Sequence, residues 1–159
     1  MSPLAEQTDE RFMRIALGEA NKAAMLGEVP IGAVVASGSG TIIGRGHNLT
    51  ERLCDVTAHA EIQAITAAAS AMGSKYLDNC TLYVTVEPCL MCAGAIGWSH
   101  LSRIVIGTPD PKGGYSANTQ RTPFHPRAEV VSGVLADECR TLMQDFFRNR
   151  RKRVFHNKS

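Results

Sequence analysis

The chain has 159 residues with a net charge of +2, and 44% of them are hydrophobic. This length suits one domain, 1–159, that buries roughly two-thirds of its unfolded surface, and the small net charge excludes a general nucleic-acid binder. Five scattered cysteines do not form a disulfide framework, residues 1–9 lack an apolar signal core, and no apolar run reaches membrane-spanning length, so we expect a cytoplasmic protein without a membrane partner.

Helical spacing of apolar residues predicts a first helix over about 8–26, capped by Thr8 or Asp9. The apolar run 31–36 and the segment 41–47, separated by a glycine-rich turn, predict a β-hairpin. Six further elements follow: an alanine-rich helix over about 57–72, a strand over 81–86, a third helix that Pro88 begins, strands over 103–107 and 129–132, and an amphipathic helix over 135–151. This order predicts an α/β fold in which helices cover a sheet.

Two segments of the chain lie outside these elements. Residues 108–127 are rich in proline and glycine, and an irregular stretch of that length in a compact domain is often functional. Residues 152–159 are expected to form a flexible basic tail. The cations near this end predict RNA contacts or, equally, a solvated helix end whose charges favour the helix dipole: Arg148, Arg150, Arg151, Lys152, Arg153 and Lys158.

The most informative motif pairs His-Ala-Glu at 59–61 with Pro-Cys-Leu-Met-Cys at 88–92. A catalytic zinc ion takes three protein ligands and keeps a fourth position for water, and His59, Cys89 and Cys92 supply three. Both cysteines fall on one face of a helix N-terminus, where exposed N–H groups favour thiolates. Glu61 is placed to move protons without serving as a ligand. The motif therefore predicts a hydrolytic enzyme with one Zn²⁺ per chain.

Two other interpretations of the cysteine pair remain open. A lone C-x-x-C can be a redox pair, and it can also be half of a structural zinc site with four protein ligands. Cys80, His100 and Cys54 are the candidates for that fourth ligand. Neither interpretation accounts for the accompanying His-x-Glu sequence.

These residues resemble the signature of zinc-dependent cytidine and nucleoside deaminases, for which the mechanism is well described. The segments 28–34, 57–62, 81–89, 133–139 and 145–151 are similar to those of bacterial tRNA-specific adenosine deaminases, and the similarity covers nearly the whole chain except the irregular segment. The resemblance implies a three-layer α/β/α fold with a mixed five-stranded sheet, a homodimer, and conversion of adenosine to inosine at the wobble position of a tRNA anticodon.

The resemblance also implies roles for individual residues. Glu61 would shuttle protons, and Asn48 would hydrogen-bond the nucleotide. Asn48 can alternatively be an ordinary turn residue. Pro30, Ala58 and Glu87 would line the pocket. The implied contacts with the anticodon loop are Asp110, Lys112, Phe146, Phe147, Arg148 and Arg151. Because the two phenylalanines are adjacent, one of them is expected to face the core.

The sequence departs from the tRNA enzymes at two places. Residues 115–124 look different and shorter, and Trp98 stands where those enzymes usually carry a histidine. A tryptophan there resembles guanine deaminases of the same fold, which makes Trp98 a candidate for the base pocket, with core packing as the alternative. A deaminase of free nucleobases or nucleosides such as guanine is therefore the second hypothesis. A non-catalytic, zinc-stabilised RNA-binding module is the third, and the presence of Glu61 argues against it.

Overall fold

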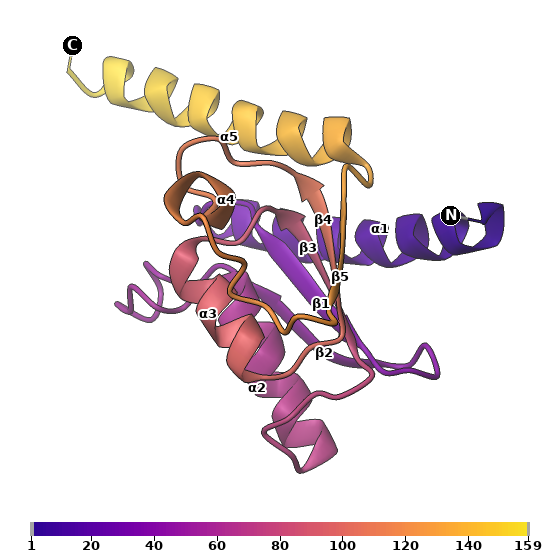
Figure 1. The fold of residues 1–159 in the computed structure, drawn as a ribbon. Helices are drawn as coiled ribbons and strands as arrows, with labels where there is room; N and C mark the ends of the chain where they lie inside the picture. The colour runs from indigo at the N-terminus through magenta and orange to yellow at the C-terminus, as the bar shows by residue number, and fades with distance from the viewer. Residues whose placement is uncertain (1, 159) are drawn as a thin grey trace.

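The computed structural model describes residues 2–158 as one sheet with helices on both faces (Figure 1). Its elements follow the order expected from the sequence, with one short helix added between the fourth and fifth strands. They are α1 (Pro3–Met25), β1 (Gly32–Ala36), β2 (Ile42–His47), α2 (Ala60–Met72), β3 (Thr81–Val86), α3 (Leu90–Trp98), β4 (Arg103–Thr108), α4 (Tyr115–Asn118), β5 (Glu129–Ser132) and α5 (Ala136–His156).

The sheet is mixed, as predicted, with the strand order β2-β1-β3-β4-β5. β1 runs antiparallel to both β2 and β3, whereas β3, β4 and β5 are parallel. Because β1 runs against both of its neighbours, the start of β1 lies beside the ends of β2 and β3. The turn that joins β1 to β2 lies at the opposite edge of the sheet, where Ser37 N donates to Thr41 O over 2.8 Å. The first of these two edges carries the site described below.

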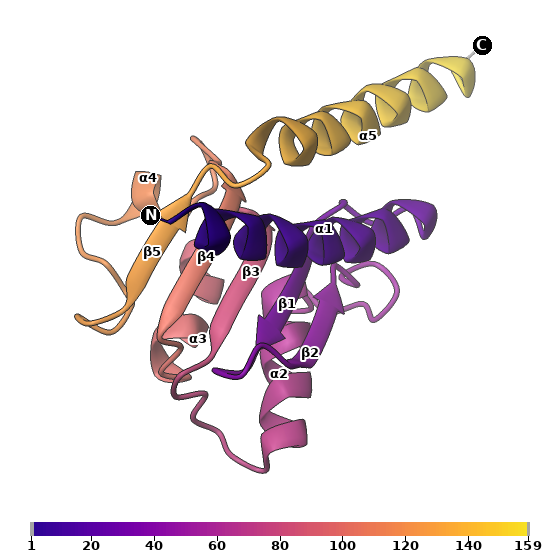
Figure 2. The same cartoon turned by 90° about the vertical axis from the view of Figure 1, so that its right-hand side faces the viewer.

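Alternate residues of the central strands fill two apolar layers. On one face, Val34, Tyr83 and Val105 pack with residues of α1 and α5. On the other face, Val35 and Leu82 pack with alanines of α2 and with residues of α3. Figure 2 shows α1 on one side of the strands and α2 and α3 on the other. The three-layer α/β/α arrangement follows from this period-2 alternation.

α2 packs against β2 at unusually short range because β2 carries two glycines on the face below the helix. A Cβ atom at Gly46 would lie 2.3 Å from Ala60 O, and one at Gly44 would lie 2.4 Å from Ala64 O. Both distances are far below van der Waals contact. The absence of side chains at Gly44 and Gly46 therefore sets how closely the N-terminal end of α2, beside His59, approaches the sheet.

The start of α1 differs from the prediction. Ser2 caps the helix by accepting a hydrogen bond from Ala5 N, and Pro3 occupies the first turn. Asp9, one of the predicted caps, lies inside the helix, is 2% exposed, and accepts hydrogen bonds from both terminal nitrogens of Arg103 at 2.6 and 2.7 Å. The hydroxyl of Tyr83 also donates to Asp9, over 3.2 Å. The predicted start was wrong because this carboxylate binds a partner on β4.

Other helix ends also moved. α2 begins at Ala60, after the predicted start, and α3 begins at Leu90 rather than at Pro88. α5 continues through residues 152–156, which were predicted to belong to a flexible tail. Arginine and lysine are good helix formers, and basic side chains in a last turn interact favourably with the helix dipole. The final residue of that predicted tail, 159, lies outside the described residues.

Candidate metal centre and substrate pocket

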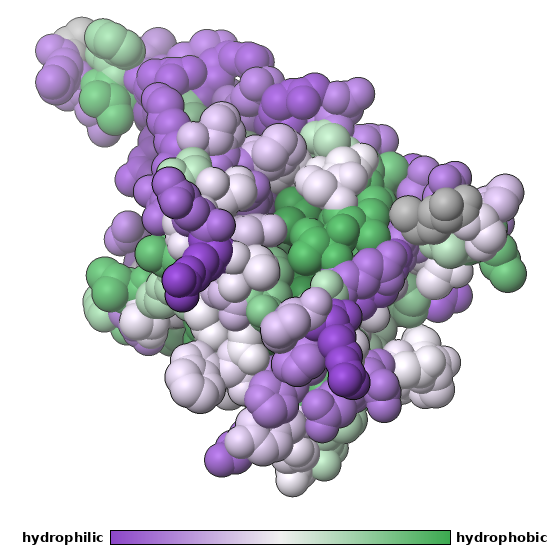
Figure 3. Space-filling model, viewed as in Figure 1, coloured by the Kyte–Doolittle hydropathy of each residue, from purple (hydrophilic) through white to green (hydrophobic). Residues whose placement is uncertain are grey.

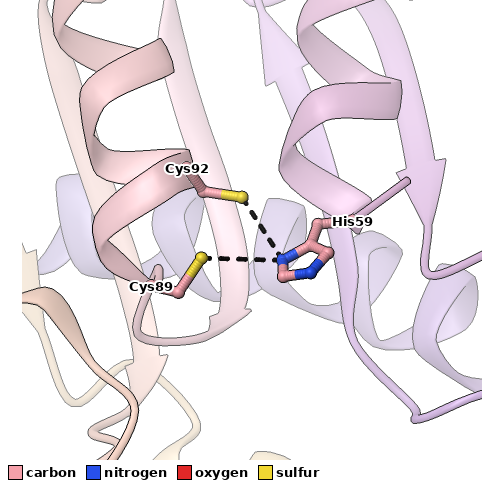
Figure 4. A group of neighbouring side chains, drawn as sticks. All are labelled: His59, Cys89 and Cys92. Atoms are coloured by element: carbon pink, nitrogen blue, oxygen red, sulfur yellow. Dashed lines mark hydrogen bonds between the residues drawn. The ribbon is translucent and has the colours of Figure 1, made fainter. Parts of the chain in front are cut away.

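Three predicted metal ligands meet between the N-terminal ends of α2 and α3. His59 is the residue that precedes α2, Cys89 is the residue that precedes α3, and Cys92 lies in the first turn of α3. Their side chains point toward one another from the two neighbouring helices (Figure 4). Nδ1 of His59 lies 3.6 Å from Sγ of Cys89 and 3.5 Å from Sγ of Cys92.

These separations fit a tetrahedral zinc ion. With Zn–S near 2.3 Å and Zn–N near 2.0–2.1 Å, tetrahedral angles place a ligand nitrogen about 3.5 Å from a ligand sulfur. All three ligand atoms lie within 4.8 Å of one another, and these three residues are the only such His/Cys/Asp/Glu group among residues 2–158. Two thiolates and one imidazole are soft and borderline donors, which suit zinc. The donor set leaves one tetrahedral position without a protein ligand.

The two cysteines share their charge unequally. Hydrogen bonds from Cys92 and His59 lower the pKa of the Cys89 thiol to about 4, despite its partial burial. The pKa of Cys92 is raised, first by its hydrogen bond to Cys89 and then by burial. The hydrogen bond to Cys89 also raises the pKa of His59. The cluster thus holds negative charge readily at Cys89, which is the state that binds a cation.

Glu61 lies in the first turn of α2, two residues after His59, and is only 3% exposed. Burial raises the pKa of its carboxyl group from 4.5 to about 7, and the charges of Cys89 and His59 also act on it. The carboxyl group belongs to the same end of α2 as His59. A carboxyl group near neutrality can both accept and release a proton at physiological pH.

Asn48 follows β2 and is 7% exposed at the site edge of the sheet. The side-chain Oδ1 of Asn48 accepts a hydrogen bond from Thr50 N at 3.2 Å. The backbone N–H of Asn48 donates to the backbone carbonyl of Ile31, which follows the buried Pro30. Leu49 N donates to the carbonyl of the buried Ala58, one residue before His59. The structure therefore brings Asn48, Pro30 and Ala58 together beside the metal centre.

Glu87 stands at the end of β3, two residues before Cys89, but it faces the irregular segment. Its Oε1 accepts a hydrogen bond from Ser116 of α4 at 2.9 Å, and its Oε2 is buried with no hydrogen-bond partner among residues 2–158. That oxygen lies against Gly114, where an added Cβ would come within 1.4 Å of it. Tyr115 N also donates to Pro88 O. The sequence reasoning missed Gly114 and Ser116, although the glycine pair at 113–114 was the available signal.

The other predicted contacts are spread more widely. Oδ1 of Asp110 accepts hydrogen bonds from the backbone N–H groups of Lys112 and Gly113, which shapes the turn before α4, and the Lys112 side chain is exposed. The remaining four residues lie on α5, across the sheet from α2 and α3: Phe146, Phe147, Arg148 and Arg151. Phe146 is half-buried and Phe147 is 38% exposed, and neither belongs to the two apolar layers of the described residues, so the expectation that one of the pair faces the core was wrong.

Trp98 does not lie in the core. It is the last residue of α3, whose nine residues span about 13 Å, so it lies at the end opposite Cys89. Its side chain is 83% exposed, which contradicts core packing. The core prediction failed because local periodicity does not tell which part of a helix surface the rest of the chain leaves uncovered.

Comparisons with known proteins agree with this geometry. Residues 6–108 match the family described as the cytidine and deoxycytidylate deaminase zinc-binding region. The chain is 48% identical over 149 residues to a tRNA-specific adenosine deaminase of Bacillus subtilis, covering 91% of this chain and 92% of the relative.

Solved structures give the same picture. A structure described under A-to-I editing by tRNA:A34 deaminases at the wobble position of transfer RNA shares 42% identity and a TM-score of 0.77, covering 83% of this chain and 98% of the other. A guanine deaminase from Bacillus subtilis shares 37% identity and a TM-score of 0.60, covering 63% of this chain and 64% of the other.

Proposed function

The chain belongs to the family of zinc-binding cytidine and deoxycytidylate deaminases, and on that premise we propose that it converts adenosine to inosine at the wobble position of a tRNA anticodon. The observation that carries the proposal is the His59, Cys89 and Cys92 cluster beside a buried Glu61, in a chain 48% identical to a tRNA-specific adenosine deaminase. Water replaces the 6-amino group of the base, and ammonia leaves.

His59, Cys89 and Cys92 would hold one zinc ion. A zinc ion with three protein ligands makes water nucleophilic near neutral pH. The three side chains themselves fix where the reaction takes place, because both helix N-termini hold them rigidly at one edge of the sheet.

Glu61 moves the protons of the reaction. Its carboxylate takes a proton from the attacking water at one oxygen and delivers it to the departing nitrogen. Burial at 3% exposure keeps bulk water from exchanging that proton, and the position in the first turn of α2 holds the carboxylate next to His59.

Asn48 orients the nucleotide, with Pro30 and Ala58 as the adjacent pocket wall. Because Asn48 Oδ1 already accepts from Thr50 N, the amide nitrogen Nδ2 is the group presented as a donor to the substrate. Glu87 supports the pocket from the other side through Ser116 and the segment around α4.

The RNA substrate is supported by the surface of α5. Five cationic side chains lie exposed along its C-terminal half: Arg148, Arg150, Arg151, Lys152 and Arg153. In Figure 3 the surface over this helix is largely hydrophilic, with a hydrophobic patch near its C-terminal end. Phe147, Val154 and Phe155 are exposed there, so bases can stack beside cations that contact phosphate. Asp110 and Lys112 are further proposed contacts.

The free-base alternative, such as a guanine deaminase, is favoured by one observation, the structural similarity to the Bacillus subtilis guanine deaminase. Trp98, which motivated that alternative in the sequence, lies at the end of α3 opposite Cys89. The third hypothesis, a non-catalytic RNA-binding module, gives no role to a buried Glu61.

We also propose a homodimer formed through α3. Met91 and Trp98 lie seven residues apart on one face of this helix and are 40% and 83% exposed, and the neighbouring Leu90 is 48% exposed. Light scattering at micromolar concentration should give twice the chain mass, and Trp98→Lys should reduce it to one chain. Met25→Lys, at an 87% exposed position on α1, is the matched control. A monomeric wild-type protein would refute the dimer.

Within residues 2–158, no helix combines the length and the apolar character needed to cross a lipid bilayer. The five cysteines are all free, which suits a reducing compartment. A cytoplasmic location, where tRNA is used, is part of the proposal.

The substrate is tested by incubating the zinc-loaded protein with an anticodon stem–loop that carries adenosine at the wobble position, and separately with free guanine, adenine and cytosine. Inosine in the stem–loop, with ammonia released in equal amount, is the expected result. A stem–loop with adenosine one position away is the control. Ammonia released only from the free bases would overturn the tRNA substrate.

A further inference from the structure

Glu28 is a buried carboxylate for which the proposed chemistry has no use. It lies between α1 and β1, is 1% exposed, and forms no ion pair with a described lysine, arginine or histidine. A carboxylate buried in this way requires strong hydrogen bonds in place of water. Those bonds come from a turn more than twenty residues further along the chain.

Three donors of that turn converge on the carboxylate. Oε1 of Glu28 accepts from Arg52 N at 2.8 Å, and Oε2 accepts from Glu51 N at 3.3 Å and from Thr50 Oγ1 at 3.4 Å. The same turn continues with Leu53 N donating to Leu49 O. Glu28 therefore acts on this turn as a capping carboxylate acts on the first N–H groups of a helix.

The anchored turn reaches the pocket through one hydrogen bond. Thr50 N donates to Oδ1 of Asn48 at 3.2 Å, and the next two backbone N–H groups, those of Glu51 and Arg52, are the ones that Glu28 holds. An amide side chain presents either an acceptor or a donor to a ligand, according to which way it is turned. Because Thr50 N engages the oxygen, the amide nitrogen is the group left to donate to a ligand.

We propose that Glu28 is a positioning residue of the active site: by holding the turn at 50–52, it fixes Asn48 so that this side chain donates a hydrogen bond to an acceptor atom of the substrate. The substrate group that Asn48 recognises is then a ring nitrogen, carbonyl or hydroxyl oxygen rather than an amine. This inference rests on the proposed function for the role of Asn48 as a substrate contact.

The decisive variant is Glu28→Gln, which keeps the size of the side chain but turns one acceptor into an N–H donor. That donor meets the N–H of Glu51 or of Arg52, so the turn must shift. Asp9→Asn is the matched control, because Asp9 is a buried carboxylate bonded to Arg103 and remote from the pocket. Both changes lower the melting temperature, and only Glu28→Gln should affect the substrate contact.

The test is a double-mutant cycle with Asn48→Ala, measured as kcat/KM on zinc-loaded protein. Glu28→Gln should lower kcat/KM at least tenfold when Asn48 is present and less than twofold when it is replaced by alanine. Asp9→Asn should change kcat/KM less than twofold in both backgrounds. Equal losses for Glu28→Gln in the two backgrounds would overturn the inference. The cycle uses whichever amine substrate the wild-type enzyme deaminates, so failure of the tRNA substrate alone affects only the proposed function.

A second measurement needs no variant. Amide hydrogen exchange of the wild-type protein should be slower at Thr50, Glu51 and Arg52 than at the exposed Val56, because each of the three lies in the anchored turn. Exchange at Arg52 as fast as at Val56 would show that the carboxylate does not hold the turn, and the inference would be wrong.

Discussion

Nδ1 of His59 lies 3.5 Å from Sγ of Cys92, although the two residues belong to different helices with a strand of the sheet between them in the chain. His59 precedes the first residue of α2, and Cys92 lies in the first turn of α3. Both helices begin at the edge of the sheet that carries the site. This closeness is a property of the folded chain, so we expect metal binding and folding to depend on each other.

Replacing a cluster cysteine should remove the metal. Purified wild-type protein should contain one zinc per chain by elemental analysis, and Cys92→Ala should contain less than about a tenth of that, because one of three ligands is lost. Cys80→Ala, a buried cysteine outside the cluster, should keep its zinc. A chelator should lower the melting temperature of the wild type and leave that of Cys92→Ala unchanged. Full zinc in Cys92→Ala would contradict the assignment of the ligands.

Glu61→Gln should separate catalysis from metal binding. The amide cannot take up the proton of the attacking water, so kcat should fall by about 10²–10⁴-fold while one zinc per chain remains bound. The measurement is single-turnover deamination beside elemental analysis on the same preparation. Activity within tenfold of the wild type would show that another group moves the proton.

The carboxylate of Glu19 should make folding stability depend on acid pH. Burial raises its pKa, but hydrogen bonds from Lys22 and His47, at 2.9 and 3.0 Å, outweigh that effect and lower the pKa below 4.5. A lowered folded-state pKa stabilises the protein above the unfolded-state value and loses that contribution as the pH falls through the folded-state pKa. The melting temperature of the wild type should therefore exceed that of Glu19→Gln at pH 7, and the gap should close below about pH 4.5. A gap that persists unchanged in acid would contradict this account.

Gly46 should not tolerate a methyl group. Its added Cβ would lie 2.3 Å from Ala60 O, so Gly46→Ala should destabilise the protein by about 1–3 kcal/mol and shift the start of α2 away from Cys92. Gly18→Ala is the contrasting control: this residue lies in α1 with nothing within 4 Å of the new atom, and it should gain about 0.5–1 kcal/mol from better helix propensity. Denaturant unfolding measures both, and a neutral Gly46→Ala would show that the helix can move outward freely.

Salt should weaken RNA binding through α5. Arg151→Ala should reduce affinity for the anticodon stem–loop and lower the slope of log affinity against log salt by about one. Arg14→Ala, an exposed arginine on α1, should leave both unchanged. Affinities would be measured by fluorescence anisotropy between 50 and 200 mM salt. An unchanged slope for Arg151→Ala would exclude a phosphate contact at this residue.

Local pattern predicted the elements whose signals are local. The strands at 81–86 and 129–132 have the expected bounds because both are short segments that contain β-branched residues. The cluster of His59, Cys89 and Cys92 was predictable because zinc chemistry restricts ligand type and spacing to few combinations.

The features that the sequence did not reveal depend on partners far along the chain. Asp9 resembled a helix cap, but its partner Arg103 is 94 residues away. The local sequence around Glu28 gives no sign that the turn at 50–52 folds over its carboxylate. Trp98 resembled a core or pocket residue, and only the packing of the other elements shows that it is left uncovered.

The hairpin turn between β1 and β2, which Ser37 and Thr41 close, lies at the edge of the sheet opposite the metal centre. The other ends of the two strands, Gly32 at the start of β1 and His47 at the end of β2, pair with each other at the edge that carries the site. A domain inserted into this turn would lie about the length of a strand away from the reacting base. The enzyme thus offers a natural attachment point for fusion proteins, one that leaves both termini and the mouth of the pocket untouched.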